Sequence, residues 1–174
     1  PATREFGPGG VSFHHHEVVG ARMTRRRMKA LRYSKQTTED VSRLVFLHMR
    51  PHTYQMGWND SAVRRYVRDA GPLLKDLNEL VRCDVTTRNR RRERTISQRI
   101  DELEERIAIL REEEELDALR PPIDGNQVME HLNLEPGRQV GEIMKMLYEK
   151  RIDDGPYTEE EAFALLDEWS ADQG

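Results

Sequence analysis

Residues 95–110, with the sequence TISQRIDELEERIAIL, decide the fold class of this chain. Apolar side chains recur there at steps of three and four positions, at Ile96, Ile100, Leu103, Ile107 and Leu110. Side chains at these steps lie on the same face of an α-helix, so the pattern predicts a helix with one narrow apolar face. We expect this helix to run from about residue 86 to residue 118 and to be the longest element.

The charges of this helix oppose its dipole. Its start is basic, with five arginines between positions 88 and 94, and its end is acidic, with four consecutive glutamates at Glu112–Glu115. A helix carries partial positive charge at its N-terminus and partial negative charge at its C-terminus, so both ends are locally unfavourable. Either contacts with the rest of the fold favour this arrangement, or a solvated bridging helix tolerates it.

Helical spacing continues through most of the chain, which predicts an all-α fold. The other predicted helices lie at about 17–31, 38–50, 62–70, 73–83, 126–132, 136–148 and 158–169. Glycines and a proline at Gly7–Gly10 predict a loop over residues 1–12, and no segment has the alternation of a useful strand. Pro121 and Pro122 predict a boundary, because two prolines cannot continue a helix.

Three of these helices begin with side chains that can cap them. Thr38 precedes two acidic residues, which predicts that the second helix starts there. Asp124 or Asn126 is expected to cap the short helix that follows them. Thr158 and Glu161 have the spacing of a capping box.

The charge of the chain is divided unevenly. Its 174 residues, enough for one domain or two small ones, carry a net charge of −4. Residues 1–100 hold 21 Lys and Arg against 10 Asp and Glu, a net +11, whereas residues 101–174 hold 7 against 22, a net −15. A basic half can attract nucleic-acid phosphates. The alternative is a basic face packed against an acidic one.

Several classes of protein are excluded or disfavoured. No run of about 18 apolar residues predicts a membrane span, and no signal segment opens the chain. A lone cysteine, Cys83, cannot form an internal disulfide, which fits the cytoplasm, and we expect it to be a buried small hydrophobe. The sequence has no nucleophile-plus-base signature and no phosphate-cradling glycine loop. We therefore assign no catalytic residue.

Histidines and an aspartate form a candidate metal site. Three consecutive histidines, His14–His16, precede Glu17 at the start of a predicted helix, His48 lies on the next helix, and Asp84 ends the fourth. Imidazole and carboxylate suit divalent first-row cations, provided that three or four ligands converge. A hydrogen-bonded or capping cluster of histidines is the alternative.

Two helix starts are candidate RNA contacts. The first combines amide and guanidinium side chains, which contact phosphates and sugars well, at Arg88, Asn89, Arg90, Arg91 and Arg92. The second is the turn at Gly137 and Arg138, where exposed N–H groups could hold a phosphate. A solvated surface helix and a plain helix start are the respective alternatives.

Together these segments resemble the C-terminal region of bacterial CCA-adding tRNA nucleotidyltransferases and poly(A) polymerases, especially an actinobacterial-like type fused to an HD domain. The resemblance covers essentially all 174 residues. Its most specific parts are Phe13–Ala21, Asp60–Tyr66, Asp84 with Thr86–Asn89, Asp124–Asn126, and Pro136-Gly137 with Val140-Gly141. The resemblance implies a truncated HD-type helical body over residues 1–84, a long connecting helix over 85–120 and a small C-terminal helical tail over 121–174.

The resemblance also implies site residues and cofactors. His16, His48 and Asp84 match HD metal-ligand positions, whereas the paired His-Asp of the family would lie upstream of Pro1, so the HD site would be incomplete. The nucleotidyltransferase head, which would bind Mg²⁺, CTP and ATP, would also lie upstream. A start at Pro1 instead of methionine fits this expectation.

The function implied is tRNA binding, in the cytoplasm, by a part of the CCA-adding enzyme that cannot transfer nucleotides alone. Three rivals stay open: a poly(A) polymerase, an HD-type metal-dependent phosphohydrolase, and a non-catalytic helical interaction module with the acidic tail as a docking surface. The sequence does not decide the oligomeric state.

Overall fold

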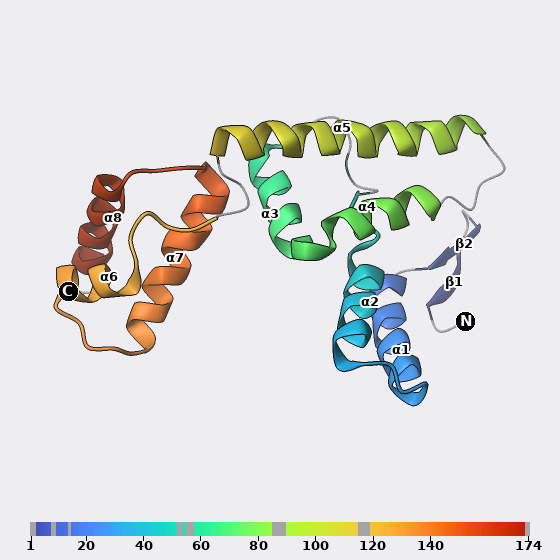
Figure 1. Ribbon diagram of the computed structural model, residues 1–174, viewed down its shortest axis with the longest axis horizontal. Helices are drawn as coiled ribbons and strands as arrows, with labels where there is room; N and C mark the ends of the chain where they lie inside the picture. Colours follow the sequence, from blue (N-terminus) through green and yellow to red (C-terminus); the bar gives the residue numbers. More distant parts are fainter. Residues whose placement is uncertain are drawn as a thin grey trace. The chain divides into compact units, whose positions relative to one another are not determined.

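The three-dimensional structure is a computed structural model. It describes residues 3–7, 10–13, 15–51, 54, 58–84, 90–114 and 119–172. The side chains of residues 4–7, 10–13, 90–93 and 172 lie outside this description. Figure 1 shows that helices dominate the described chain, which confirms the predicted all-α class.

The described helices follow the predicted order. They are α1 (His16–Ala30), α2 (Lys35–Leu47), α3 (Asp60–Ala70), the short 3-10 helix η2 (Gly71–Leu73), α4 (Leu74–Cys83), α5 (Arg90–Glu114), α6 (Gly125–Leu132), α7 (Arg138–Asp154) and α8 (Glu159–Asp172). The 25-residue α5 is the longest, as its apolar stripe predicted. Within the described ranges, no helix is long and apolar enough to cross a membrane.

The loop predicted for residues 1–12 was wrong. Two antiparallel strands occupy it, β1 (Arg4–Gly7) and β2 (Gly10–Phe13), with Arg4 opposite Phe13 and Gly7 opposite Gly10. Each strand has four residues, too few for alternation of apolar and polar side chains to stand out. Two of the glycines that suggested a loop lie within these strands, Gly7 at the end of β1 and Gly10 at the start of β2.

Helices α1 and α2 pack side by side as an antiparallel hairpin (Figure 1). Small residues bring the helices close: a Cβ at Gly20 would lie 3.2 Å from Val45 Cγ1, and Thr38 and Ser42 are buried. The Thr38 and Ser42 hydroxyls donate to carbonyls one turn earlier, at 2.8 and 2.6 Å. Helix α1 has no fully buried residue, so its face away from α2 is open to solvent.

Helix caps explain where the helices begin, with one correction. Helix α2 starts four residues before the predicted cap: the Ser34 hydroxyl accepts from the Thr37 N–H at 3.0 Å, and Thr38 lies inside the helix. Asp124 caps α6 in a capping box with Gln127. The predicted box before α8 is confirmed, because Thr158 N–H donates to Glu161 at 2.7 Å and Glu161 N–H donates to Thr158 at 3.2 Å.

The chain divides into two compact units. One unit holds residues 1–57 and 69–104, and the other holds residues 58–68 and 105–174. Of the three boundaries between these segments, the one after residue 57 precedes α3, and the ones after residues 68 and 104 fall inside α3 and α5. The three segments expected from the resemblance, with boundaries at 84 and 120, remain a prediction.

In the first unit, α4 packs along the first part of α5. The apolar face of α4 is buried at Leu77 and Val81, and that of α5 at Ile100 and Leu103. Arg82 adds polar contacts to α5, donating to Asp101 Oδ1 and Glu104 Oε2, both at 2.6 Å. Cys83, which was expected to be buried, is exposed. It lies two positions beyond Val81, on the opposite side of the helix from the buried face.

In the second unit, α6, α7 and α8 lie together (Figure 1), and apolar side chains between them form a core. The residues at its centre are Ile123, Val128, Ile143, Leu147, Ala162 and Leu166, each at most 2% exposed. Tyr157 closes one side, donating its hydroxyl to the Leu147 carbonyl at 2.8 Å. Burial raises the pKa of Tyr157 to about 12, since the ionised phenolate would lose solvation.

Candidate nucleic-acid interface

The first predicted RNA contact lies at the start of α5. Arg88 and Asn89 are outside the described residues. Arg90, Arg91 and Arg92 form the first turn of α5, but their side chains are also outside the description. The helix therefore starts where the arginines concentrate, and the predicted phosphate contacts stay a prediction.

The second predicted contact lies at the start of α7. Gly137 is its N-cap in an extended conformation, and Arg138 is its first residue. The Arg138 side chain is 91% exposed and donates from Nε to Glu142 Oε1 at 2.8 Å, one turn along the helix. A cation and free N–H groups are thus presented together, although Glu142 partly neutralises the cation.

The three predicted metal-ligand residues come close to one another at the base of α1. His16 Nε2 lies 3.3 Å from His48 Nε2, with the two rings edge to face. Asp84 Oδ2 lies 3.9 Å from His48 Nε2. Glu17 lies beside both neighbouring histidines, with Oε1 3.8 Å from His15 Nδ1 and Oε2 4.0 Å from His16 Nδ1. His14 lies outside the described residues.

A hydrogen bond to the backbone determines the tautomer of neutral His48. Its Nδ1 lies 2.6 Å from the Val45 carbonyl, which can only accept, so Nδ1 carries the proton. In the neutral ring, Nε2 then has a free lone pair, which accepts from His16. An imidazole that is anchored to the backbone through Nδ1 and can accept at Nε2 is also the arrangement of many metal-binding histidines.

The side chains of His16, His48 and Asp84 are of the types that bind divalent cations. They do not, however, converge in sufficient number. Two imidazoles and one carboxylate suit first-row divalent metals. Among the residues that the structure describes, however, no group of three or more His, Cys, Asp or Glu side chains converges as a metal site. The described geometry is that of a histidine pair with Asp84 3.9 Å from His48 and Glu17 4.0 Å from His16.

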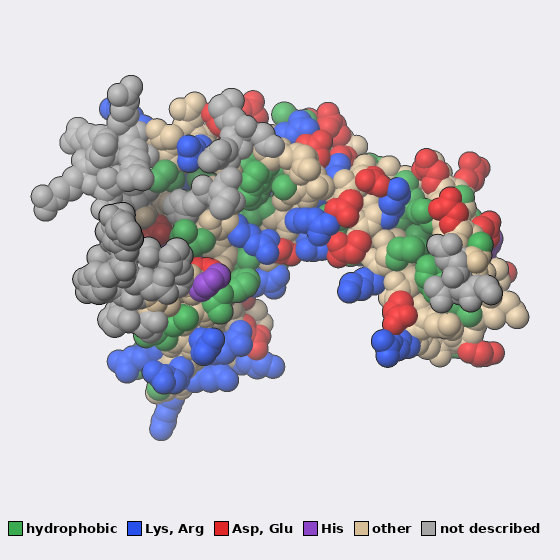
Figure 2. Space-filling view, turned by 180° about the vertical axis from the view of Figure 1, so that it is seen from behind, with side chains coloured by type: hydrophobic (Ala, Val, Ile, Leu, Met, Phe, Trp, Pro, Cys, Tyr) green, Lys and Arg blue, Asp and Glu red, His purple; other side chains and the backbone are tan. Residues whose placement is uncertain are grey.

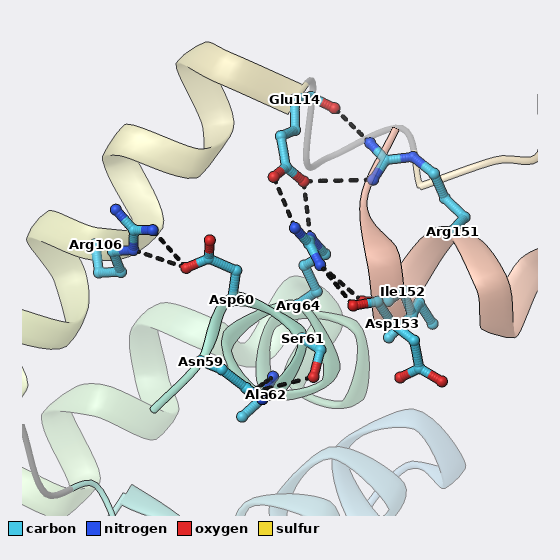
Figure 3. Close-up of polar contacts among 10 residues, drawn as sticks. All are labelled: Asn59, Asp60, Ser61, Ala62, Arg64, Arg106, Glu114, Arg151, Ile152 and Asp153. Atoms are coloured by element: carbon cyan, nitrogen blue, oxygen red, sulfur yellow. Dashed lines mark hydrogen bonds and ion pairs between the residues drawn. The ribbon is translucent and has the colours of Figure 1, made fainter. Parts of the chain in front are cut away.

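The sequence did not reveal the role of the motif at Asp60–Tyr66. Arg64, on α3, is only 5% exposed and forms a two-pronged ion pair with Glu114 at the end of α5. Its Nε and Nη2 donate to the two carboxylate oxygens, both at 2.8 Å, and Nη1 donates to the Ile152 carbonyl at 2.9 Å (Figure 3). Arg151 adds Nη2–H to the Glu114 carbonyl at 2.7 Å. One carboxylate, 10% exposed, is therefore shared by two buried arginines.

The other charges of the motif, and Arg68 just beyond it, are also paired within the second unit. Asp60 accepts from Arg106 Nε at 2.9 Å, Arg65 donates to Glu149 at 3.1 Å and to Asp153, and Arg68 donates to Glu149 at 3.2 Å. Tyr66 is buried against Trp58, with ring centres 5.8 Å apart. The arginines of α3 bind protein carboxylates, so they stabilise the fold and do not form a phosphate-binding face.

We call the cluster of Glu114 with Arg64 and Arg151 the Glu114 clamp. Its contacts shift the pKa values of Glu114 and Arg64. Hydrogen bonds from Arg64 lower the pKa of Glu114, outweighing burial, which acts in the other direction. The bond to Glu114 likewise raises the pKa of Arg64. The acidic end of α5, which opposes the helix dipole, is thereby explained at Glu114: partners from α3 and α7 favour a negative charge there.

The chain is similar in sequence to two curated proteins. No protein-family model matches it, and no solved structure matches it. It is 33% identical over 175 aligned residues to the A-adding tRNA nucleotidyltransferase of Deinococcus radiodurans. It is 34% identical over 174 residues to the CC-adding tRNA nucleotidyltransferase of Thermus thermophilus. The resemblance to tRNA nucleotidyltransferases is confirmed.

These alignments cover nearly all of this chain but only a part of each relative. Each includes 97% of this chain, but only 38% of the Deinococcus protein and 37% of the Thermus protein. The chain thus spans less than two-fifths of the length of these relatives.

Proposed function

We propose that this chain is the tRNA-binding, C-terminal part of a tRNA nucleotidyltransferase. The observation that carries the proposal is that one segment is similar, at 33% and 34% identity, to an A-adding and to a CC-adding enzyme. These relatives differ by name in the nucleotide they add and agree in acting on tRNA. Because the two enzymes share this segment but add different nucleotides, the segment is better suited to binding the shared tRNA substrate than to selecting the nucleotide.

The parent protein, in this proposal, extends tRNA 3′ ends by CCA with CTP and ATP. Nucleotide transfer, with its Mg²⁺, belongs to a head outside this chain, so the chain alone is expected to be inactive. A parent that adds only CC or only A is a second candidate, favoured by the names of the two relatives.

The contacts proposed with tRNA are electrostatic. Arg88, Asn89, Arg90, Arg91 and Arg92 would bind phosphates at the start of α5, and Gly137 with Arg138 would bind one at the start of α7. Double-helical RNA is recognised largely by shape and backbone contacts, which suits arginines at helix N-termini. The pairing of the arginines of α3 with carboxylates supports placing these contacts elsewhere.

A divalent metal at His16, His48 and Asp84 is part of the proposal only as a weak, accessory site. Two imidazoles and a carboxylate would supply its protein ligands, and a bound cation would act there as a Lewis acid. Zn²⁺ or Mn²⁺ should then raise the melting temperature of the chain slightly and that of a His48→Gln variant not at all. An equal response of both proteins would remove the site from the proposal.

The RNA contacts are tested by replacing Arg88, Arg90, Arg91 and Arg92 with alanine and measuring tRNA binding across a salt series. Each lost phosphate contact should reduce the slope of log affinity against log salt by about 1. We expect a slope lower by about 2 to 4. An unchanged slope would show that these arginines do not contact the RNA.

The absence of transfer chemistry has its own test. The chain is incubated with tRNA lacking its 3′ CCA and labelled CTP and ATP. We expect no extension under conditions in which a whole tRNA nucleotidyltransferase completes it. Incorporation of label by the purified chain would contradict the proposal that nucleotide transfer belongs to a head outside this chain.

A further inference from the structure

A second group of cations, outside the surfaces discussed so far, lies on α1 and just beyond it. Six exposed cationic side chains fall within eleven residues, at Arg22, Arg25, Arg26, Arg27, Lys29 and Arg32. Figure 2 shows Lys and Arg side chains gathered over the hairpin of α1 and α2. Four of the six share one face of the helix, because their positions are spaced by three, four and seven. We call the stripe formed by Arg22, Arg25, Arg26 and Lys29 the basic stripe.

The basic stripe is not used within the fold. Throughout the described part of the chain, none of its four side chains forms a hydrogen bond or an ion pair. The arginines of α3 and α4 behave differently, since Arg64, Arg65 and Arg82 all bind carboxylates. The unused cations are therefore a property of this helix and not of arginines in this chain generally.

Local helix energetics do not account for the stripe. Cations at the C-terminal end of a helix are favourable, but this effect fades within the last turn, which holds Arg27 and Lys29. Arg22 and Arg25 lie earlier in the helix. Like charges three or four positions apart, such as Arg22 with Arg26, destabilise a helix by a few tenths of a kcal/mol per pair. An anionic ligand would turn this unfavourable grouping into a favourable one.

A groove between α1 and α2 runs beside the stripe. Its α1 wall includes Arg22, Arg25 and Lys29, and its α2 wall includes Arg43 and Phe46. Arg43 is held in place by donating from Nε to the Asp69 carbonyl at 2.9 Å. The groove also contains a carboxylate, Glu39, which lies 4.0 Å from Lys35 Nζ. The groove thus has an excess of positive charge along its length.

Two aromatic side chains lie open in the same groove. Tyr33 is 55% exposed and lines the section with Arg25 and Lys29, and Phe46 is 45% exposed and lines the section with Arg22 and Arg43. Grooves that combine cations for the backbone with aromatic rings for stacking are typical of proteins that bind single nucleic-acid strands. A purely electrostatic surface would not need the rings.

We propose that the groove between α1 and α2 is an RNA-binding site. Arg22, Arg25 and Lys29 bind successive phosphates, over roughly 10 Å of helix, and Phe46 stacks on an unpaired base. The inference rests on the proposed tRNA-binding function, to which it adds a second contact surface. Its residues differ from those proposed at the starts of α5 and α7.

The test compares two triple variants that remove the same charge. The groove variant is Arg22→Gln, Arg25→Gln and Lys29→Gln. The control variant is Lys75→Gln, Arg120→Gln and Lys145→Gln, three exposed cations outside the groove and outside the proposed helix-start contacts. Glutamine keeps a high helix propensity, and circular dichroism verifies that each variant is folded.

Binding of tRNA is measured across a salt series. We expect the groove variant to lose about 2 to 3 from the salt slope and about tenfold or more in affinity near 0.1 M salt. The control variant should keep a slope close to that of the parent. If the groove variant loses helicity, Arg25→Gln alone should lower the slope by about 1.

The possible failures are distinguishable. If the parent binds tRNA and the groove variant matches the control, the groove is not an RNA site, and the proposed function stands. If the parent binds no RNA, the proposed function fails and this inference fails with it. Phe46→Ala should weaken binding of an unpaired RNA strand about fivefold or more with an unchanged salt slope. Unchanged affinity would overturn the stacking contact.

Discussion

Arg64 and Glu114, fifty positions apart in the sequence, form a largely buried two-pronged ion pair with both N–O distances at 2.8 Å. Arg64 is 5% exposed and Glu114 10% exposed, so the pair is shielded from water. Arg151 binds the same glutamate, which joins α3, α5 and α7 through one carboxylate. This pair is where the motif at Asp60–Tyr66 contributes to the structure.

Replacing Arg64 with methionine should destabilise the protein by about 3–5 kcal/mol, because it leaves the Glu114 charge buried with only Arg151 as a partner. Arg65→Gln is the matched control. Its ion pairs are more than one-third exposed, so the cost should stay below about 1 kcal/mol. Urea unfolding measures both. Equal losses in the two variants would mean that Arg64 is no more important than a surface arginine.

The Glu114 clamp should make stability depend on pH in the acid range. Because the folded-state pKa of Glu114 is lowered from 4.5, its contribution is complete above that value and is lost as the pH falls through the folded-state pKa. The free energy of unfolding should therefore fall more steeply below about pH 4.5 in the parent than in Glu114→Gln. Urea unfolding at a series of pH values checks this. Parallel curves for the two proteins would assign the acid sensitivity to other carboxylates.

Two glycines of the second unit should respond to alanine in opposite ways. Gly155 has φ +98°, and a Cβ there would lie 3.0 Å from Arg64 Nη2, so Gly155→Ala should destabilise by about 1–3 kcal/mol. Gly141 lies inside α7 with no atom within 4 Å of an added Cβ. Gly141→Ala should stabilise by about 0.5–1 kcal/mol. Thermal unfolding of both variants decides, and a stabilised Gly155→Ala protein would contradict the described clamp.

The histidine pair should show one defined arrangement of protons. The bond to the Val45 carbonyl places the proton of neutral His48 on Nδ1, and His16 then donates from Nε2. Nitrogen NMR shifts of the two rings distinguish these tautomers. A His48 ring protonated at Nε2 instead would mean that the 2.6 Å contact with Val45 is not a hydrogen bond.

Helices were predictable because their signals are local. The stripe from Ile96 to Leu110 repeats often enough to identify α5, and the cap pairs at Asp124 and Thr158 mark the helix starts. The β1–β2 hairpin was missed because four-residue strands carry little periodicity. The start of α2 was placed too late because Thr38, which resembles a cap, is buried against α1 and bonds within its own helix.

The candidate sites were predictable only in part. The sequence placed His16, His48 and Asp84 in one region by resemblance, and the structure brings them close together. It could not reveal that Arg64 is buried while Arg25 is exposed, because both are arginines on amphipathic helices. That difference depends on partners from α5 and α7, which lie far along the chain.

Binding of tRNA by this chain at two salt concentrations tests the central claim most directly. A mature tRNA competes against an unstructured RNA of the same length. The account predicts a preference for tRNA and an affinity that weakens steeply as salt rises, since backbone contacts supply most of the binding. No preference for tRNA, or no binding at low salt, would contradict the claim that these residues recognise tRNA.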